Sequence, residues 1–445
     1  MRILLINHRY FVASGAERYL FNIERVLGRA GHETAVFSID YKQNEPSPWS
    51  PWFTSPIGGP EEVFFDQHRR RPASFAKTFQ RLFYSAEVEQ DLTRLIEDFR
   101  PDVAYLMLFM RKLSPSVLVA LHKAKVPIVV RVSDYGFLCA EHHFLRDGKT
   151  CTKCLNGRLW PGVVHGCVHD SRLVSALDAA ATWYHRRRGL LDLIDRFVTT
   201  NPFLTEMMVK GGFPRERLAC IPTFADEETF CGQPQGTRRH LLYFGRLDPS
   251  KGLETLIDAM GLLRSRMGRA HIPPLRIVGS PQYVDYGREL VRRVRRAGLV
   301  DCIHFDGAVP AEQIPALLKD SVASIIPSLW FENLPNSYLE SICAGVPVIA
   351  SDLGSLSLAI EHEKDGLLFQ PGDAEALASS IERLLTDREL EDRLRKEGPA
   401  KAQREYSAGR HLELLIGLFT SLTGRHAAGA GQDGLRSAKR IMSRP

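Results

Sequence analysis

Long apolar runs are absent from this sequence of 445 residues. No stretch approaches the roughly 18 consecutive apolar residues that would span a bilayer. The start offers only the apolar segment Ile3–Ile6 before polar positions follow, whereas the core of a secretory signal needs about 7–15 apolar residues. Cysteine is also scarce, at 8 residues, which excludes a disulfide scaffold. We therefore expect a soluble cytoplasmic protein, in which any membrane contact is made at the inner face of the membrane.

The chain also has only a small excess of positive charge. Lys and Arg number 58 against 52 Asp and Glu, which leaves a net charge of +6. This balance is too weak to indicate nucleic acid as a partner, but it suits an anionic small ligand. Hydrophobic residues make up 44% and charged residues 25% of the chain, as in ordinary globular proteins. At roughly 100–200 residues per domain, the length predicts two or three domains.

Alternating strand and helix patterns organise both halves of the chain. Ile3–Ile6 indicates a buried strand, a helical pattern follows up to Gly31, and Thr34–Ile39 indicates the next strand. Such βαβ units predict a parallel sheet covered by helices. After a polar stretch at 226–239, the pattern restarts with a strand at Leu241–Phe244. We therefore predict an α/β protein with two Rossmann-like domains that face each other across a cleft, which is the default ligand site.

These patterns set the predicted domain bounds. The first domain covers residues 1–225 and contains a Cys-rich insertion at 139–167, and the second domain covers 236–404. A helical pattern at about 405–423 is expected to return to the first domain, and the basic Gly/Ala-rich tail at 424–445 is expected to be disordered. Further strands are predicted at Pro101–Phe109, Ile128–Val132, Phe197–Thr200, Leu275–Val278, Ile303–Phe305, Val322–Ile326 and Val346–Ala350.

One segment of the second half combines a helix start with two carboxylates. The strand Val322–Ile326 ends in a loop that opens a helix near Asn336, and Gly345 ends that helix. A helix N-terminus at the carboxyl end of a strand favours anions. Glu332 and Glu340 flank this point, and their carboxylates would repel a phosphate. Each carboxylate can instead accept hydrogen bonds from the vicinal hydroxyls of a ribose or a hexose.

Two cations lie in the loop after the strand Leu241–Phe244. They are Arg246 and Lys251. Fixed cations stabilise the negative charge that develops on a diphosphate leaving group. The chain has no Asp-x-Asp pair that would hold a divalent metal against such a diphosphate. We therefore expect these two side chains to replace the metal, so that catalysis needs no cofactor.

These segments resemble the retaining glycosyltransferases of family 4, which have the GT-B fold. The Glu-x7-Glu motif of that family is matched by Glu332 and Glu340, and its Gly-Arg…Lys-Gly motif by Gly245–Gly252. Its Gly-Gly-Ala-Glu loop is close to Ser14–Glu17, and its Gly-His-Glu sequence is matched by Gly31–Glu33. The resemblance covers about residues 1–410. Each motif alone is weak, whereas their order and context are specific.

The resemblance implies a role for each matched residue. Glu340 would bind the ribose hydroxyls of a nucleoside diphosphate sugar, and Glu332 would bind the donor sugar near its hydroxyls. Gly15 would allow the N-terminal loop to approach closely, because glycine lacks a Cβ. The transfer would retain the anomeric configuration. The diphosphate would be held by Arg246, Lys251 and the backbone N–H groups of Asn333 and Leu334.

One position departs from the family pattern. Where the family usually has His-Asp-Tyr at the end of a first-domain strand, this chain has Ser133–Tyr135. That His commonly contacts the donor sugar, and Ser133 is smaller and carries no charge. Asp134 remains able to contact sugar or acceptor, so the candidate catalytic residues are Glu332, Asp134 and Ser133. The change implies an altered donor geometry, reduced activity, or a harmless replacement if a neighbour such as His8 fills the space.

Four cysteines cluster in the first-domain insertion. Their spacing is C-x11-C-x2-C-x12-C, through Cys139, Cys151, Cys154 and Cys167. Cys-x2-Cys is the spacing of a metal knuckle, and four thiolates suit a closed tetrahedral zinc site. A metal would supply free energy that a loop with little apolar material lacks. We predict a structural zinc, with an iron–sulfur cluster or four unrelated thiols as the alternatives.

Basic runs and aromatic residues bear on the partner of the first domain. In enzymes of the resembled kind, such residues often dock an anionic membrane or a lipid-linked acceptor, while the alternative is a solvated face over a core stripe. Four arginines, Arg292, Arg293, Arg295 and Arg296, lie on one helical pattern of the second domain. The first-domain residues concerned are Arg69–Arg71, Arg186–Arg188, Phe64, Phe65, Phe75, Phe79, Phe83 and Tyr84.

These observations predict a metal-independent glycosyltransferase. It would move a sugar from a nucleoside diphosphate sugar to a glycan or lipid-linked acceptor, in cell-surface polysaccharide synthesis. One alternative is a GT-B epimerase or phosphorylase, which phosphate dependence would separate. Another is a catalytically silent binding protein, which Ser133 favours and the intact Glu332, Glu340, Arg246 and Lys251 oppose. The base, sugar, acceptor and linkage depend on loops, and fold analogy does not transfer them.

Overall fold

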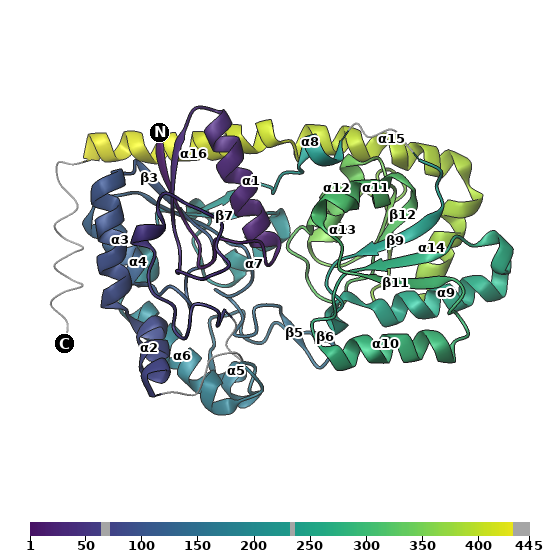
Figure 1. Cartoon of the computed structure of the whole chain (residues 1–445), viewed down its shortest axis with the longest axis horizontal. Helices are drawn as coiled ribbons and strands as arrows, with labels where there is room; N and C mark the ends of the chain where they lie inside the picture. The colour runs from purple at the N-terminus through teal and green to yellow at the C-terminus, as the bar shows by residue number, and fades with distance from the viewer. Residues whose placement is uncertain (64–71, 232–235, 430–445) are drawn as a thin grey trace.

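Each half of the chain is built on its own six-stranded sheet (Figure 1). The computed structural model describes residues 1–63, 72–231 and 236–429. The strand order is β2-β1-β3-β4-β7-β8 in the first half and β11-β10-β9-β12-β13-β14 in the second. All pairings in both sheets are parallel. The predicted α/β architecture with two Rossmann-like halves is thus confirmed.

The first half contains eight strands and seven α-helices among its described residues, and the short helix α8 follows where the chain crosses to the second half. The strands are β1 (Arg2–Ile6), β2 (Glu33–Phe37), β3 (Val103–Leu106), β4 (Ile128–Arg131), β5 (Leu145–Arg146), β6 (Lys149–Thr150), β7 (Arg196–Thr199) and β8 (Leu218–Cys220). The helices are α1 (Gly15–Arg29), α2 (Pro72–Phe83), α3 (Ala86–Phe99), α4 (Ser116–Lys123), α5 (Trp160–Val164), α6 (Arg172–Arg187), α7 (Pro202–Lys210) and α8 (Glu227–Phe230).

The second half repeats the alternation. Its strands are β9 (His240–Phe244), β10 (Leu275–Val278), β11 (Ile303–Gly307), β12 (Ser321–Ile326), β13 (Val348–Ser351) and β14 (Leu367–Phe369). Its helices are α9 (Leu253–Met267), α10 (Val284–Arg296), α11 (Ile314–Lys319), α12 (Asn336–Cys343), α13 (Ser355–Ala359), α14 (Ala374–Thr386), α15 (Arg388–Glu405) and α16 (Ala408–Gly429).

Local sequence explains how the first βαβ unit forms. The four side chains Ile3–Ile6 are fully buried, as expected for a strand covered by helices on both faces. Ser14 caps α1, since its Oγ accepts from the backbone N–H of Ala16 at 3.3 Å. The apolar face of α1 is buried, and a glycine with φ +80, Gly31, follows the helix. This places the start of α1 just beyond the carboxyl end of β1, at the edge of the sheet where the site lies.

Four strands were not predicted from the sequence: the two-residue strands β5 and β6 of the insertion, and one strand in each six-stranded sheet. β8 and β14 have three residues each, and Cys220 at the end of β8 is exposed. Both strands lie at the edge of a sheet, where neighbours rather than local pattern decide whether a short segment pairs. The first sheet therefore ends one strand later than the predicted last strand at Phe197–Thr200.

Helix α16 carries the chain back from the second half to the first. Figure 1 shows α15 over the second half and α16 over the first, along the upper edge of both. Leu415, Phe419 and Leu422 of α16 join the same core as Ile3 and Leu5 of β1. The end of the chain thus completes one face of the first sheet.

The structure also contains a disulfide bond. Cys231 and Cys343 form a disulfide, which the sequence analysis did not predict, between the end of α8 and the end of α12.

Within the described ranges, no helix combines the length and the apolar character needed to cross a bilayer. The predictions for Phe64, Phe65, Arg69–Arg71 and residues 430–445 fall outside the residues that the structure describes.

Candidate functional site

Glu332 lies in the loop between β12 and α12, at the carboxyl edge of the second sheet. Only 4% of the residue is exposed. Its Oε1 accepts hydrogen bonds from Lys251 Nζ at 2.7 Å and Trp330 Nε1 at 2.9 Å, and from Ser328 Oγ at 2.5 Å. All three bonds end on Oε1, which leaves Oε2 to accept from a ligand.

Glu340 lies on α12 and meets the first half of the molecule. Arg18 of α1 donates to its Oε1 at 2.5 Å, while Oε2 is buried and has no hydrogen-bond partner among the described residues. Burial raises the pKa of Glu340 to about 7, against the opposing effect of Arg18. One buried acceptor atom is therefore open to a hydroxyl donor.

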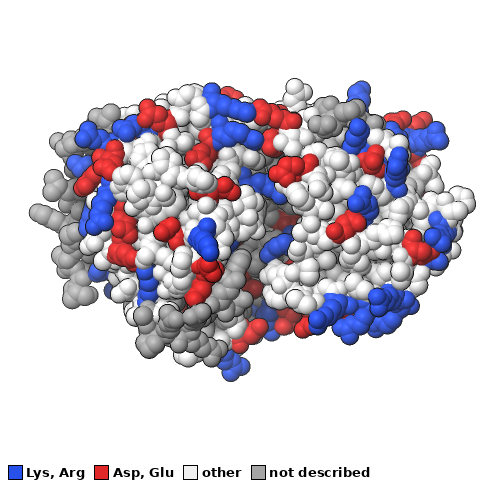
Figure 2. All heavy atoms as spheres, in the orientation of Figure 1, with Lys and Arg blue, Asp and Glu red and all other residues white. Residues whose placement is uncertain are grey.

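A cavity between the two halves gives access to Glu340. It has a volume of about 270 Å³ and is lined by Arg18 and Tyr19 from the first half and by Asn336 and Glu340 from the second. Figure 2 shows the surface hollowed between the halves. A Cβ on Gly15 would lie 3.4 Å from Asn336 Nδ2, so the first residues of α1 and α12 approach each other here. The predicted close approach at Gly15 is consistent with this geometry.

The loop after β9 brings Lys251 to Glu332. Gly252 has φ +68, and a Cβ at this position would lie 1.9 Å from the backbone oxygen of Pro327. Only glycine fits such a contact between the two loops. The backbone N–H of Leu329 also donates to Ser250 O at 2.8 Å. Arg246 is exposed, and its Nη1 donates to Gln282 Oε1 at 2.7 Å.

Asn333 ties the β12–α12 loop to the first half. Its Nδ2 donates to Val132 O at 3.1 Å and to Ser133 O at 3.0 Å. Its Oδ1 accepts from Thr200 and Asn201. The side chain of Asn333 therefore connects the second half of the molecule to the first.

Leu334, the next residue, takes φ +54 and is buried. Its backbone N–H donates to Ser355 Oγ at 3.2 Å. This donor would have to leave Ser355, or be shared, before it could bind the diphosphate as predicted.

Asp134 is paired with a histidine that the sequence analysis did not single out. Its Oδ2 lies 2.9 Å from His142 Nδ1, and its Oδ1 accepts from the backbone N–H of Gly136 at 2.8 Å. Burial works to raise the pKa of Asp134, but His142 and the Gly136 hydrogen bond outweigh it and lower the pKa to about 2. The Nε2 atom of His142 is buried, and no residue in the described part of the chain forms a hydrogen bond with it. Ser133 accepts from Arg131 at 2.8 Å.

The Cys-rich insertion reaches across to the second half. The rings of His143 and Trp330 are 4.9 Å apart between centroids, and Trp330 also bonds Glu332. Tyr135 OH donates to the backbone oxygen of Glu332 at 3.3 Å. A loop that appeared from sequence to be a separate structural insertion thus supplies His142 and His143 to the site. The signal available in the sequence was this pair of adjacent histidines, eight and nine residues after Asp134.

The four cysteines of the insertion lie near one another. Burial raises the pKa of Cys154 to about 11, with further contributions from Cys139, Cys167 and Cys151. None of the four forms a disulfide. In residues 1–63, 72–231 and 236–429, however, no group of three or more His, Cys, Asp or Glu side chains is arranged so that it could hold a metal ion. The residue type and the proximity of the four cysteines suit a zinc ion, whereas the arrangement of the described side chains does not form a metal site.

A second cavity opens in the first half beside Asp134. Its volume is about 330 Å³. His8, which was predicted as a neighbour of Ser133, lies in its wall together with Arg131, Ser133, Asp134 and His142. Burial is the main cause that lowers the pKa of His8 to about 3, so the imidazole is neutral at physiological pH. This cavity is the candidate acceptor side of the site.

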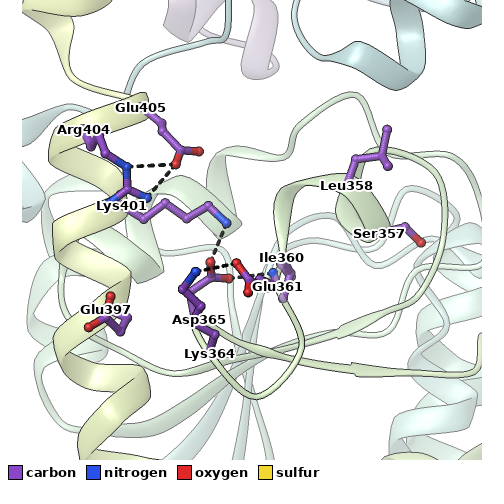
Figure 3. Close-up of a pocket in the computed structure, with 10 residues that line it drawn as sticks. All are labelled: Ser357, Leu358, Ile360, Glu361, Lys364, Asp365, Glu397, Lys401, Arg404 and Glu405. Atoms are coloured by element: carbon purple, nitrogen blue, oxygen red, sulfur yellow. Dashed lines mark hydrogen bonds and ion pairs between the residues drawn. The ribbon is translucent and has the colours of Figure 1, made fainter.

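A third hollow, of about 540 Å³, lies in the second half between the α13–β14 segment and α15 (Figure 3). Lys401 Nζ pairs with Asp365 at 2.6 Å and also donates to Ala359 O. Lys364 pairs with Glu361 at 2.7 Å. Figure 3 shows these charges turned toward one another. The hollow is accordingly held together by internal ion pairs and contains none of the predicted site residues.

The arginines predicted on one helix of the second half lie on α10. Figure 2 shows Lys and Arg atoms gathered along the lower edge of that half, where Figure 1 places α10. Arg293 pairs with Asp258 at 2.5 Å, and Arg292 and Arg296 pair with Glu289 at 3.1 and 2.5 Å. These pairs match the alternative of a solvated face.

Two six-stranded parallel sheets, each covered by helices in its own half of the chain, are the architecture of the GT-B class of glycosyltransferase folds. Sucrose-phosphate synthase from Thermosynechococcus elongatus shares this fold with a TM-score of 0.68 and 19% identity, over 95% of this chain and 99% of that chain. The Anabaena protein HepE in complex with UDP gives a TM-score of 0.63 at 17% identity, over 95% of this chain and 100% of that chain.

Two family models match most of the chain. The model described as "Glycosyl transferase 4-like domain" matches residues 14–223, and the model described as "Glycosyl transferases group 1" matches residues 226–401. The chain therefore belongs to the glycosyltransferases of this two-domain type, as the motifs indicated.

Curated relatives agree with this assignment over part of their length. The D-inositol 3-phosphate glycosyltransferase of Jonesia denitrificans is 33% identical over 174 residues, which are 37% of this chain and 39% of the relative. A GDP-mannose-dependent alpha-(1-6)-phosphatidylinositol monomannoside mannosyltransferase of Mycobacterium tuberculosis is 30% identical over 193 residues, 40% of this chain and 49% of the relative. The chain thus spans less than half of the length of these two relatives.

Proposed function

We propose that this chain is a retaining glycosyltransferase that moves a sugar from a nucleoside diphosphate sugar to a glycan or lipid-linked acceptor, in cell-surface polysaccharide synthesis. The observation that carries the proposal is the pair of buried carboxylates, Glu332 and Glu340, each with one oxygen left for a ligand. They flank the start of α12, opposite Gly15. Such oxygens suit the hydroxyls of a sugar and a ribose.

The donor would lie along the carboxyl edge of the second sheet. Glu340 Oε2 accepts from the ribose, and Arg18 then turns from Glu340 toward the ligand or shares the carboxylate. Lys251 exchanges part of its contact with Glu332 for the diphosphate, and Arg246 joins it from the surface. Fixed cations aimed at the leaving group stabilise the charge that appears there in the transition state.

The transfer itself needs no metal or cofactor in this proposal. An acceptor hydroxyl oxygen bonds to the anomeric carbon on the face that the diphosphate leaves. The bond from that carbon to the diphosphate oxygen breaks and its electron pair stays on the diphosphate, which takes the hydroxyl proton. Asp134 orients His142, whose Nε2 contacts the sugar in place of the histidine that Ser133 replaces.

We also propose that the first half touches an anionic membrane. Figure 1 shows α2, α5 and α6 together at one end of this half. The basic residues Arg172, Arg187 and Arg188 are exposed on α6 or at its end. Aromatic and apolar side chains beside cations suit the interface of an anionic bilayer. The exposed apolar side chains on the three helices are Phe75, Phe79, Trp160, Val164, Leu173, Leu177 and Trp183.

The membrane proposal is tested by flotation with vesicles. We expect the protein to float with vesicles that contain anionic lipid, and the double variant Trp160→Ser, Trp183→Ser to float less. Leu358→Ser, at an exposed apolar residue of the second half, is the control and should behave as the wild type. Equal flotation of the double variant would contradict the proposal.

A structural zinc in the insertion is a further part of the proposal. The four thiols at Cys139, Cys151, Cys154 and Cys167 would close around the ion and fix the loop that carries His142 and His143. Metal analysis of the purified protein should find about one zinc per chain, and less in Cys151→Ser. The control is Cys302→Ser, at a buried cysteine of the second half. A purified protein with neither zinc nor iron at these thiols would contradict the proposed metal site.

The transferase proposal is tested by a thermal-shift panel without added metal. UDP- and GDP-sugars come first, because relatives are named for GDP-mannose and a similar structure holds UDP-glucose. A ligand at 100 times its Kd adds about 2.7 kcal/mol to the free energy of unfolding. We expect one base to raise the melting temperature by several degrees in the wild type and not in Glu340→Ala. No shift with any donor would favour the silent binding protein.

A further inference from the structure

The half-buried ring of Trp330 touches two charged side chains of the donor site. Trp330 lies in the loop between β12 and α12, two residues before Glu332. Its Nε1 donates to Glu332 Oε1 at 2.9 Å, and Lys251 Nζ lies 4.9 Å from the centre of its ring. Trp330 therefore contacts both the proposed partner of the donor sugar and a proposed partner of the diphosphate.

The N–H group of this indole matters most once a donor is bound. In the free protein, Glu332 Oε1 accepts from Lys251, Trp330 and Ser328. When Lys251 turns toward the diphosphate, Trp330 and Ser328 are left to hold that oxygen. Glu332 is 4% exposed, and a buried carboxylate oxygen that loses a donor is costly because water does not easily replace it. The indole thus keeps Oε1 in place, so that Oε2 stays directed to the sugar.

The Cys-rich insertion of the first half packs against this ring. The rings of His143 and Trp330 are 4.9 Å apart between centroids, with their planes at 64°. The next residue of each loop repeats the contact, since the rings of Phe144 and Phe331 are 6.3 Å apart at 74°. Figure 1 shows the hairpin β5–β6, which begins at Leu145, extended toward the second half. Two neighbouring rings of the donor loop thus pack on two neighbouring rings of the insertion.

Resting on the proposed function, we propose that Trp330 is a positioning residue for Glu332 and that His143 fixes the ring of Trp330. Trp330 acts through the carboxylate and not on the reacting atoms. A contact from the first half thereby contributes to recognition of the sugar in the second half. The role predicts an effect on the sugar and none on the nucleotide, because Glu340, Arg246 and Lys251 bind the nucleotide.

The test compares nucleoside diphosphate sugars with the matching nucleoside diphosphates. Calorimetry measures UDP-glucose against UDP, GDP-mannose against GDP, ADP-glucose against ADP and dTDP-glucose against dTDP. The proteins are the full-length wild type, Trp330→Phe, Glu332→Ala and the double variant. Phenylalanine keeps a ring for Lys251 and His143 but has no N–H group. The bare nucleotide reports the integrity of the site, so the ratio of the two affinities isolates the sugar.

We expect Trp330→Phe to lower the affinity for the sugar nucleotide about tenfold relative to the bare nucleotide, as the loss of a hydrogen bond to a charged group does. Affinity for the bare nucleotide should stay within about twofold. In the Glu332→Ala background, the same substitution should change the ratio by less than about twofold, because the carboxylate through which Trp330 acts is gone.

Three results would overturn the inference. They are an unchanged ratio in Trp330→Phe, an equal loss of affinity for both ligands, and a full effect of the substitution in the absence of Glu332. A wild type that binds none of these ligands would instead contradict the transferase proposal, and this inference would fall with it.

The role of the insertion is tested by His143→Gln, which also decides if Trp330→Phe does not fold. The substitution removes the ring that packs on Trp330 and should lower the same ratio about threefold, as the loss of an edge-to-face pair does. His165→Gln, at an exposed histidine of the same insertion, is the control and should keep the wild-type ratio. A wild-type ratio in His143→Gln would show that the insertion does not fix Trp330.

Discussion

At the scale of single residues, we expect the charge of one carboxyl group, Glu340, to control donor binding. Burial holds the pKa of Glu340 at about 7, so near pH 6 most of the free protein carries a neutral Glu340. If the ribose binds the carboxylate only, donor affinity should be about tenfold weaker at pH 6 than at pH 8. Calorimetry with a nucleoside diphosphate sugar measures this, because a diphosphate esterified at both ends does not titrate there.

The matched variant for this prediction is Glu340→Gln. It should bind the donor weakly and with the same affinity at both pH values. The pKa of Glu340 in the folded protein lies above its ordinary value of 4.5. The group therefore also destabilises the folded state as pH rises from about 4.5 toward 7, and the variant should lose that slope. A wild-type affinity that does not change with pH would show that Glu340 does not bind the donor in its charged form.

Motif spacing located some residues of the site, and it could not locate others. Glu332 and Glu340 belong to one loop and helix, so their common location follows from local sequence. Arg18 meets Glu340 from 322 positions away, and only the packing of the two halves reveals that contact. His142 was visible as a residue of the insertion, but its partner became clear only when the loop was seen to fold back on Asp134.

At the scale of elements, the contact between the β9 and β12 loops depends on Gly252. A Cβ there would meet the backbone oxygen of Pro327 at 1.9 Å in a positive-φ conformation. We expect Gly252→Ala to lower the free energy of unfolding by at least about 2 kcal/mol, from strain and displacement together. It should also weaken donor binding, since Lys251 precedes it. Urea unfolding and thermal shift measure the two effects.

Gly28→Ala is the control for this substitution. Gly28 lies inside α1, and nothing stands within 4 Å of an added Cβ. Alanine should stabilise that helix by about 0.5–1 kcal/mol. A Gly252→Ala protein as stable as the wild type would mean that the two loops do not need this close approach.

Long, regular elements were predictable and short edge elements were not. The buried apolar strands and the helix after Pro335 follow from hydrophobic patterning and helix signals. The strands β8 and β14 have three residues each, too few for a pattern to emerge. The disulfide between Cys231 and Cys343 joins residues 112 positions apart, a pairing that spacing alone does not indicate.

At the scale of the whole molecule, α16 makes the stability of the first half depend on the end of the chain. Phe419 is fully buried against Tyr105 of β3, with ring centroids 5.6 Å apart. We expect Phe419→Ala to lower the free energy of unfolding by about 3–5 kcal/mol. Its exposed neighbour Thr420 gives the control, since Thr420→Ala should stay within about 0.5 kcal/mol. Similar stability of both variants would show that α16 is not part of the core.

The two connections between the halves meet at one place. The chain leaves the first half near Ala225 and returns near Tyr406, and the backbone N–H of Ala225 donates to Tyr406 O at 2.9 Å. The two crossing segments therefore lie side by side and are tied by a main-chain hydrogen bond. Any rotation of one half against the other would have to pass through this point, which is where we expect a hinge to lie.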